Sequence, residues 1–266
     1  MKVIVSGAAG RMGRAILESL YEDETLELVG ALEKKGHAAI KKDAGELLGI
    51  GKWGVTITEL TKKTLKNSEV IIDFTYPQST VQLIQEAKDH EKPMVIGTTG
   101  FTPDHLKKIE TAAKKIPVVL SPNMSIGVNV MFKLIAEASA ALGTDYDVEI
   151  LEIHHRLKKD APSGTAIRMG EVLAASRGTT LQQAGRFTRQ GNIGARPSGE
   201  IGIQSLRAGD VVGEHTMTFA GTGERIELTH RAHNRNNFAR GALMAAQWVT
   251  TQDPGLYDMM DVLNLK

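Results

Sequence analysis

Three glycines near the start of the chain constrain its fold more than any other feature. They follow an apolar, β-branched run at residues 2–6 and precede the segment AILESLYEDE, whose apolar residues have helical spacing. In such a strand–turn–helix unit, Gly7 allows a tight turn, Gly10 lets the backbone approach a pyrophosphate, and Gly13 allows the helix to pack closely on the strand. An ordinary glycine-rich turn is the alternative. The strand before and the helix after favour a dinucleotide site.

The second predicted strand, residues 26–32, ends in a charged pair. A carboxylate at this point, here Glu33, can accept hydrogen bonds from the adenosine ribose hydroxyls, which favours NADH. The next residue, Lys34, can attract a 2′-phosphate, which favours NADPH, although a solvated surface lysine is the alternative. The pair predicts a protein that accepts both NADH and NADPH.

Alternating strand and helix patterns continue to about residue 120. Short apolar runs predict strands at 70–74, 93–97 and 117–120, and segments of helical spacing predict helices at 79–90 and 102–113. This alternation is typical of an α/β fold and predicts an N-terminal Rossmann-type domain with a parallel sheet.

The pattern changes after about residue 125. Long helices are expected at 127–142 and 165–176, a loop-rich stretch at 178–200, and a last helix at 238–249 that returns to the first domain. Strand-like alternation is expected at 148–154, 201–206, 211–219 and 225–229. These elements predict a second, α+β domain with an open mixed or antiparallel sheet. The predicted boundaries are 1–125 with 234–266 for the first domain and 126–233 for the second.

The composition excludes several classes of function. The chain has no cysteine, which excludes disulfides, thiolate metal sites and thiol nucleophiles. A formal net charge of +1 gives no argument for a nucleic-acid partner. No apolar run approaches the roughly 18 residues of a membrane span, and the opening apolar run is too short for a secretory signal. We therefore expect a cytoplasmic protein without a nucleic-acid or membrane partner.

A basic, histidine-rich segment, EIHHRLKKDAPSGTA, spans residues 152–166. A histidine can supply a proton near neutral pH, and a lysine can hold a carboxylate or stabilise negative charge. Ser163–Thr165 directly precede a predicted helix, whose N–H groups can bind a carboxylate. Together these features predict a site for an anionic substrate that must be protonated, and a plain solvated loop is the alternative. We expect no metal here, because His154 and His155 point to opposite faces of a strand.

Two further turns follow predicted strands at the edge where parallel sheets bind ligands. They are Gly97–Gly100 and Ser121–Met124, and we expect both to contact a ligand, although each can be a simple β–α turn. The remaining histidines of the second half, His215, His230 and His233, are expected to have structural or interface roles.

Several motifs resemble one family. They are VSGAAGRMGR, FT-x-P, VIGTTGF, E-x-HH-x-x-K-x-DAPSGTA, RAGDVVGEHT and H-x-A-x-x-R-x-x-F-A-x-GA. In combination they resemble the 4-hydroxy-tetrahydrodipicolinate reductase (dihydrodipicolinate reductase) family, and the likeness covers nearly the whole chain. The resemblance implies NADH- or NADPH-dependent reduction of a small cyclic dicarboxylate with loss of water, in diaminopimelate and lysine biosynthesis. It also implies a homotetramer built by the second domain.

The resemblance further assigns roles to individual residues. His154 matches the family's proposed proton donor, Lys158 its proposed catalytic cation, and His155 and the Gly164–Thr165 pair its substrate-carboxylate ligands. The residues that match the family's cofactor-binding positions are Gly7, Ala8, Ala9, Gly10, Arg11, Met12, Glu33, Lys34, Gly97, Thr98, Thr99, Ser121, Pro122, Asn123 and Met124.

Two alternatives remain open at this point. A reductase of another small acid shares the cofactor site, but the lack of cysteine disfavours enzymes that form a thioester. A dinucleotide-sensing regulatory protein needs no proton donor, so the pairing of His154 with Lys158 disfavours it.

Overall fold

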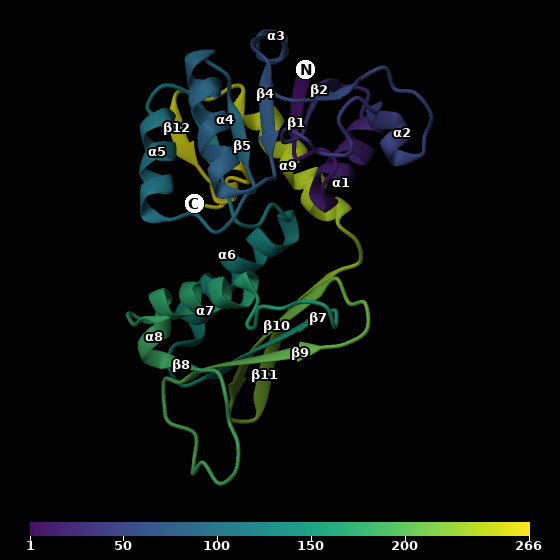
Figure 1. The fold of residues 1–266 in the computed structure, drawn as a ribbon. Coiled ribbons are helices and arrows are strands. Elements are labelled where there is room, and N and C mark those ends of the chain that lie inside the picture. Colours follow the sequence, from purple (N-terminus) through teal and green to yellow (C-terminus); the bar gives the residue numbers. More distant parts are fainter. The chain divides into compact units, whose positions relative to one another are not determined.

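The chain folds into two compact units (Figure 1). The computed structural model describes residues 1–266, apart from the side chain of Lys62. One unit contains Met1–Ile126 and Arg235–Lys266, and the other contains Gly127–Asn234. No described helix combines the length and the apolar character that a bilayer span requires.

The first unit holds an all-parallel sheet of seven strands in the order β12-β6-β5-β4-β1-β2-β3. Its elements, in chain order, are β1 (Lys2–Ser6), α1 (Arg11–Tyr21), β2 (Glu27–Leu32), α2 (Ala44–Leu48), β3 (Ile57–Thr58), α3 (Lys62–Lys66), β4 (Val70–Asp73), α4 (Pro77–Asp89), β5 (Met94–Ile96), α5 (Pro103–Ala113), β6 (Pro117–Leu120), α9 (Asn236–Val249), β12 (Gly255–Tyr257) and α10 (Met259–Val262).

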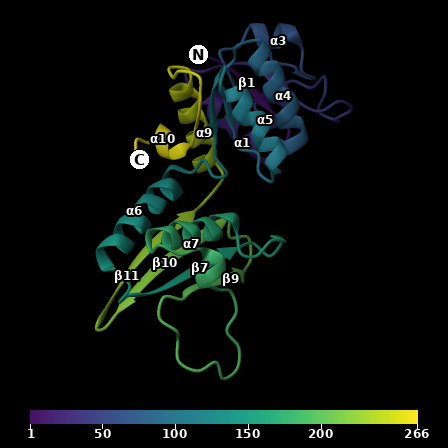
Figure 2. The ribbon, with the colours of Figure 1, turned by 90° about the vertical axis from the view of Figure 1, so that its left-hand side faces the viewer.

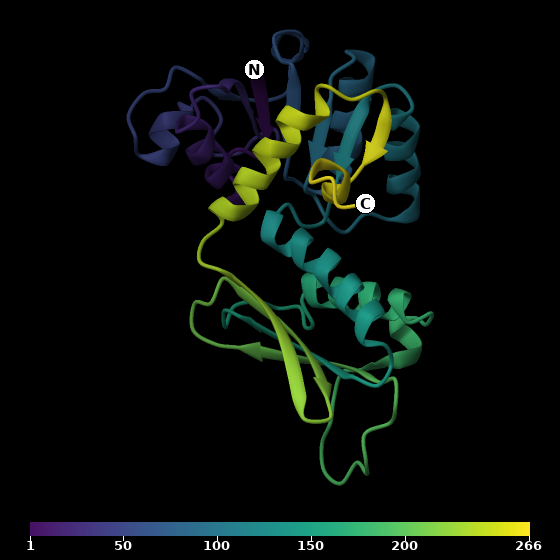
Figure 3. The same cartoon turned by 180° about the vertical axis from the view of Figure 1, so that it is seen from behind.

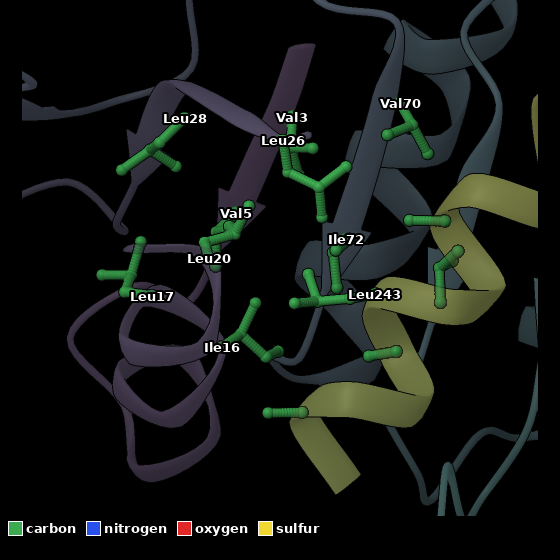
Figure 4. Packing of buried hydrophobic residues seen from close by; sticks show 14 of the residues in the cluster. Val3, Val5, Ile16, Leu17, Leu20, Leu26, Leu28, Val70, Ile72 and Leu243 are labelled. Atoms are coloured by element: carbon green, nitrogen blue, oxygen red, sulfur yellow. The ribbon is translucent and has the colours of Figure 1, made fainter. Parts of the chain in front are cut away.

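Helices cover both faces of this sheet, which explains the uninterrupted apolar run of β1. Val3 and Val5 are fully buried in a cluster with α1 and α9, where Ile16 and Leu243 also lie (Figure 4). The intervening Ile4 packs into the opposite cluster, with residues of α4 and α5. Seen from behind, α9 crosses the back of the sheet although it comes from the C-terminal segment (Figure 3).

The glycine turn depends on two positions that admit no side chain. Gly7 has a φ of +78°, and a Cβ there would lie 2.5 Å from the carbonyl oxygen of Phe74. A Cβ at Gly13 would lie 2.0 Å from the carbonyl oxygen of Gly7, so only glycine lets α1 approach the turn this closely. The N–H groups of Gly7 and Ala8 both donate to the carbonyl of Leu32, which fixes the turn to the end of β2.

The second unit is built on a mixed five-stranded sheet in the order β11-β10-β7-β9-β8. Its elements are α6 (Ile126–Leu142), β7 (Asp147–His154), α7 (Gly164–Ser176), α8 (Leu181–Ala184), β8 (Gly185–Arg186), β9 (Ile201–Arg207), β10 (Gly213–Gly221) and β11 (Glu224–Ala232).

The α6 and α7 helices pack on one face of this sheet (Figure 2). Alternate residues of the central strand, among them Val148 and Ile150, are buried in the cluster that these helices close. The opposite face carries apolar side chains that remain accessible, with Leu151 at 38% and Leu206 at 48% exposure. This alternation follows the period of two expected for a sheet covered on one side.

The predicted fold class is confirmed: a Rossmann-type parallel sheet and a second unit with a mixed sheet. The short elements were not predicted from the sequence. The strands β3, β8 and β12 have two or three residues, and α2, α3, α8 and α10 have four or five. Segments of this length show no measurable periodicity.

Candidate functional site

A cavity of about 870 Å³ lies at the carboxyl edge of the parallel sheet in the first unit. This volume is within the range that ligand sites of proteins occupy. The cavity receives residues from the glycine turn, from the end of β2 and from the loops after β4 and β5. Ten residues predicted to bind cofactor line it: Gly7, Ala9, Gly10, Arg11, Met12, Glu33, Lys34, Gly97, Thr98 and Thr99.

Glu33 joins the end of β2 to the glycine turn. Its Oε1 accepts a hydrogen bond from the Ala9 N–H at 2.9 Å, and its Oε2 accepts one from the Lys34 N–H at 3.3 Å. The carboxylate therefore stands beside the start of α1, where Gly10 caps the helix without any side-chain bond to the free N–H groups. Those N–H groups carry the partial positive charge that binds phosphate.

Five residues predicted to bind cofactor do not line this cavity. Ala8 is fully buried in the core, where it donates only its backbone N–H to Leu32. Ser121 donates to the carbonyl of Asn123, while Met124 is buried in the hydrophobic cluster beside α9. Pro122 and Asn123 lie in the same turn, outside the cavity lining.

A buried carboxylate connects two of the loops that line the cavity. Asp73, at the end of β4, is fully buried and accepts hydrogen bonds from the hydroxyls of Thr75, Thr80 and Thr98. The Thr98 hydroxyl also accepts the Thr75 N–H at 2.9 Å, so the loops after β4 and β5 are bonded to each other. Burial raises the pKa of Asp73, and the hydroxyl bonds act against that rise.

Several residues that line the cavity were not predicted from the sequence. Lys35 and His37 follow the charged pair, and Phe74, Thr75 and Tyr76 form the loop after β4. The FT-x-P motif falls on that loop, and its position directly after a buried strand is the signal that points to it.

In the second unit, the proposed proton donor is held by a buried ionic network. The Nδ1 atom of His154 lies 2.5 Å from Oε2 of Glu152, whose side chain is fully buried. Arg207 donates to both oxygens of the same carboxylate, at 2.9 and 3.0 Å. Residues 152 and 154 share a face of β7, and Arg207 is the register partner of His154 on β9.

The turn before α7 is part of the same network. The Ser163 N–H donates to Oε1 of Glu152 at 3.1 Å, and the Ser163 hydroxyl accepts the N–H of Ala166, which caps the helix. The same hydroxyl bonds to Nε2 of His215 at 2.9 Å. The rings of His215 and His154 meet edge to face at 5.1 Å between centroids.

The other predicted substrate residues lie in the loop between β7 and α7 or at the start of α7. The ammonium group of Lys158 pairs with both carboxylate oxygens of Asp160, at 2.8 and 2.9 Å. A Cβ at Gly164, the first residue of α7, would meet no atom within 4 Å, so the space at this helix start is open. Thr165 is the next helix residue, and His155 is half-buried at the beginning of the loop.

Burial and the charges of this network shift the pKa values of His154 and Glu152. Burial lowers the pKa of His154, the bond to Glu152 offsets this in part, and the charges of Lys158 and Arg207 lower the pKa further. Burial alone would raise the pKa of Glu152, but hydrogen bonds from Arg207 and His154 hold that pKa below its ordinary value. Imidazolium at position 154 is thus a stronger acid than free histidine.

Burial lowers the pKa of His215 to about 3, and its Nδ1 has no hydrogen-bond partner within the part of the chain that the structure describes. Because this pKa lies below the unfolded value of about 6.5, protons bind the unfolded chain in preference. The free energy of unfolding should therefore fall as pH drops below about 6.5, by up to about 1.4 kcal/mol per pH unit from this group.

His215→Gln should remove that contribution, so the loss of stability between pH 7 and 4 should shrink by about 2–3 kcal/mol. Urea titrations followed by circular dichroism at several pH values measure this change. His233→Gln, at an exposed histidine, is the control and should leave the pH dependence as in the parent chain. Equal slopes for the His215 variant and the parent chain would contradict a neutral, buried His215.

Comparisons with known proteins match nearly the whole chain to one family. The family model described as "Dihydrodipicolinate reductase, N-terminus" matches residues 1–124, and the one described as "Dihydrodipicolinate reductase, C-terminus" matches residues 127–263. A protein of Syntrophus aciditrophicus named 4-hydroxy-tetrahydrodipicolinate reductase is 53% identical over 100% of this chain and 99% of its own. One of the same name from Geotalea uraniireducens is 50% identical, with both chains fully covered.

Solved structures show the same fold. Dihydrodipicolinate reductase from Paenisporosarcina sp. TG-14, solved with dipicolinate bound, is 25% identical and matches with a TM-score of 0.77 over 98% of each chain. GenD2 from gentamicin A biosynthesis, solved with NAD, is 14% identical and matches with a TM-score of 0.64 over 100% of this chain and 90% of its own. The latter likeness concerns the fold alone.

Proposed function

Because this chain belongs to the dihydrodipicolinate reductase family, we propose that it reduces 4-hydroxy-tetrahydrodipicolinate to tetrahydrodipicolinate with NADH or NADPH and loss of water. This reaction is a step of diaminopimelate and lysine biosynthesis. One observation carries the proposal. Glu152 is hydrogen-bonded both to His154 and to the Ser163 N–H, at the open start of α7 before Gly164. Such a site offers a proton and an anion-binding helix end together.

The substrate is a small dicarboxylate, and the basic loop has the groups to hold one. Gly164 and Thr165 would offer the first N–H groups of α7 to a carboxylate, and His155 would bind the second carboxylate. The related reductase from Paenisporosarcina was solved with dipicolinate, a ring that carries two carboxylates. Lys158 is paired with Asp160 and must exchange this partner for the substrate if it is to stabilise charge there.

The residues of the cavity in the first unit fit a dinucleotide. The start of α1 would hold the pyrophosphate, because Gly10 leaves its N–H groups uncapped. Glu33 would accept hydrogen bonds from the adenosine ribose, and Lys34 would attract a 2′-phosphate. Loss of the 4-hydroxyl group and a neighbouring ring proton as water leaves a conjugated ring, and the bound nicotinamide would supply a hydride to its conjugated carbon.

The protein's own contribution is orientation, charge and one proton. The helix and loop donors fix the substrate carboxylates, and Lys158 stabilises the negative charge that develops towards the ring nitrogen. His154 then delivers a proton to the neighbouring carbon. Because burial lowers the pKa of His154, its imidazolium gives up the proton more readily, and turnover should decline as pH rises through that pKa.

Replacing His154 by Gln should lower kcat by roughly 10²- to 10⁴-fold, the usual effect of losing a general acid, and Lys158→Met should also lower kcat strongly. Both variants should bind NADH as the parent enzyme does, since neither residue lies in the unit that contains the dinucleotide cavity. The assay is NADH oxidation with and without freshly prepared substrate, beside a fluorescence titration of NADH.

Lys159→Met, at the exposed neighbouring lysine, is the matched control and should keep near-normal turnover. If the His154 and Lys158 variants turned over as fast as the parent enzyme, these two residues could not be the proton donor and the catalytic cation. An absence of substrate-dependent NADH oxidation in the parent enzyme would end the proposed function, and the dinucleotide-sensing protein would then be the favoured alternative.

The preference between the two nucleotides should depend on Lys34. Lys34→Ala should raise the KM for NADPH by roughly 3- to 10-fold and leave the KM for NADH almost unchanged, since a partly exposed ion pair contributes about 1 kcal/mol. Steady-state kinetics with each nucleotide measure the two values. Lys108→Ala, on the exposed side of α5, controls for the loss of one positive charge. Equal changes with NADH and NADPH would show that Lys34 does not select the phosphate.

The open face of the second unit's sheet supports self-association, and the family resemblance makes a homotetramer the expected assembly. Leu151 and Leu206 lie on this face at 38% and 48% exposure, and a second copy of the face would cover them. Light scattering should give a mass near four times the chain's 28.8 kDa. Leu206→Glu should lower that mass, whereas Leu134→Glu, on α6, should leave it unchanged. A parent protein that is monomeric or dimeric at micromolar concentration would refute the proposal.

A further inference from the structure

Glu152 is a buried carboxylate without a part in the chemistry described above. Its side chain is 0% exposed and every bond that it makes is to a donor. Oε1 accepts from the Ser163 N–H and from Arg207, and Oε2 accepts from His154 and again from Arg207. The Ser205 side chain also bonds to this carboxylate. With these donors around it, the carboxylate has no free position for a substrate or for proton transfer, so it must act through the groups that it holds.

We propose that Glu152 is a positioning residue, which fixes the tautomer and the orientation of His154 so that Nε2 is the atom that delivers the proton. This inference rests on the proposed function of His154 as proton donor. With Nδ1 donating to Glu152 at 2.5 Å, Nδ1 keeps its hydrogen in both protonation states of the ring. Only Nε2 is then left to lose and regain a proton, as in other histidines oriented by a carboxylate.

The surroundings of Nε2 agree with this assignment. Within the described residues Nε2 makes no hydrogen bond, and it is not among the polar atoms sealed from solvent. A Cβ at Gly213, the first residue of β10, would lie 2.9 Å from Nε2 and would crowd that side of the ring. The glycine leaves the proton-carrying atom open, whereas Nδ1 is enclosed.

Arg207 explains how Glu152 can hold this position through a reaction cycle. When His154 gives up its proton, Glu152 would become an uncompensated buried charge if histidine were its only counter-ion. The guanidinium of Arg207 bridges both carboxylate oxygens and carries its charge at every relevant pH. The other groups around the imidazole are Lys158, whose charge lowers its pKa, and His215, whose ring contacts it edge to face.

The same carboxylate connects the proton donor to the helix start that would bind the substrate. Oε1 accepts the Ser163 N–H, and Ser163 caps α7 directly before Gly164. The orientation of His154 and the position of the substrate-binding helix end are therefore set by one group.

Glu152→Gln tests the inference. The amide carries no charge and can donate to Nδ1, which favours the tautomer with its hydrogen on Nε2. The pKa of His154 should fall, because the neighbouring carboxylate no longer stabilises the imidazolium. The pH at which kcat declines should move down with it, and kcat at pH 8 should drop about 10-fold or more. Glu152→Asp keeps the charge and should restore part of both properties.

The pKa is measured by ¹³C-histidine NMR, with the His154 signal identified by its absence in His154→Gln, and kcat is measured across pH. Glu171→Gln, at an exposed carboxylate on α7 paired with Arg168, is the matched control. Circular dichroism and NADH titration establish that each variant is folded.

Two outcomes separate this inference from the proposed function. A His154 pKa in Glu152→Gln that equals the parent value overturns the positioning role, whatever the kinetics show. A His154 pKa that falls while the pH profile of kcat stays in place overturns instead the assignment of His154 as proton donor. A fall of both together, with partial recovery in Glu152→Asp, supports the inference.

Discussion

The parallel pairing of the first sheet is the constraint on which its ligand cavity depends. Every strand of that sheet runs in the same direction, so each chain segment must return over a face before it can pair again. Helices therefore cover both faces, and the carboxyl ends of the strands meet at one edge. The glycine turn after β1, Glu33 after β2 and the threonines after β4 and β5 gather there because the topology permits no other arrangement.

Among the described residues, Asp73 and Glu152 are the two carboxylates that are fully buried, and their surroundings differ. Asp73 accepts hydrogen bonds from threonine hydroxyls and has no counter-ion among the described residues, so burial raises its pKa, and it serves to join two loops. Glu152 has the guanidinium of Arg207 and remains ionised, with its pKa below the ordinary value. A negative charge balanced by Arg207 can orient a titrating imidazole, whereas the hydroxyl-bonded Asp73 holds two loops together.

Local sequence patterns predict the long helices and strands and the loops that carry the site. They do not predict which side chains meet across neighbouring strands. The period of two along β7 places Glu152 beside His154, and this could be read from the sequence. Arg207 lies more than fifty residues further along and reaches Glu152 only through the parallel register of β7 and β9, which no local pattern specifies. Likewise, the turn at Ser121–Met124 follows a strand of the right sheet, yet Met124 is drawn into the core under α9. Side-chain direction there is decided by tertiary packing.

The first unit is discontinuous in sequence, and this affects the order in which a ribosome can complete the molecule. Its hydrophobic cluster includes Ala242, Leu243 and Ala246 of α9, and β12 supplies the strand beside β6. Residues 127–234 contain their own core and are synthesised before those C-terminal pieces. The inserted unit can thus fold without them, while the N-terminal part keeps an uncovered apolar sheet face until α9 and β12 emerge. Nascent chains stalled before α9 are the species that would most need protection by a chaperone.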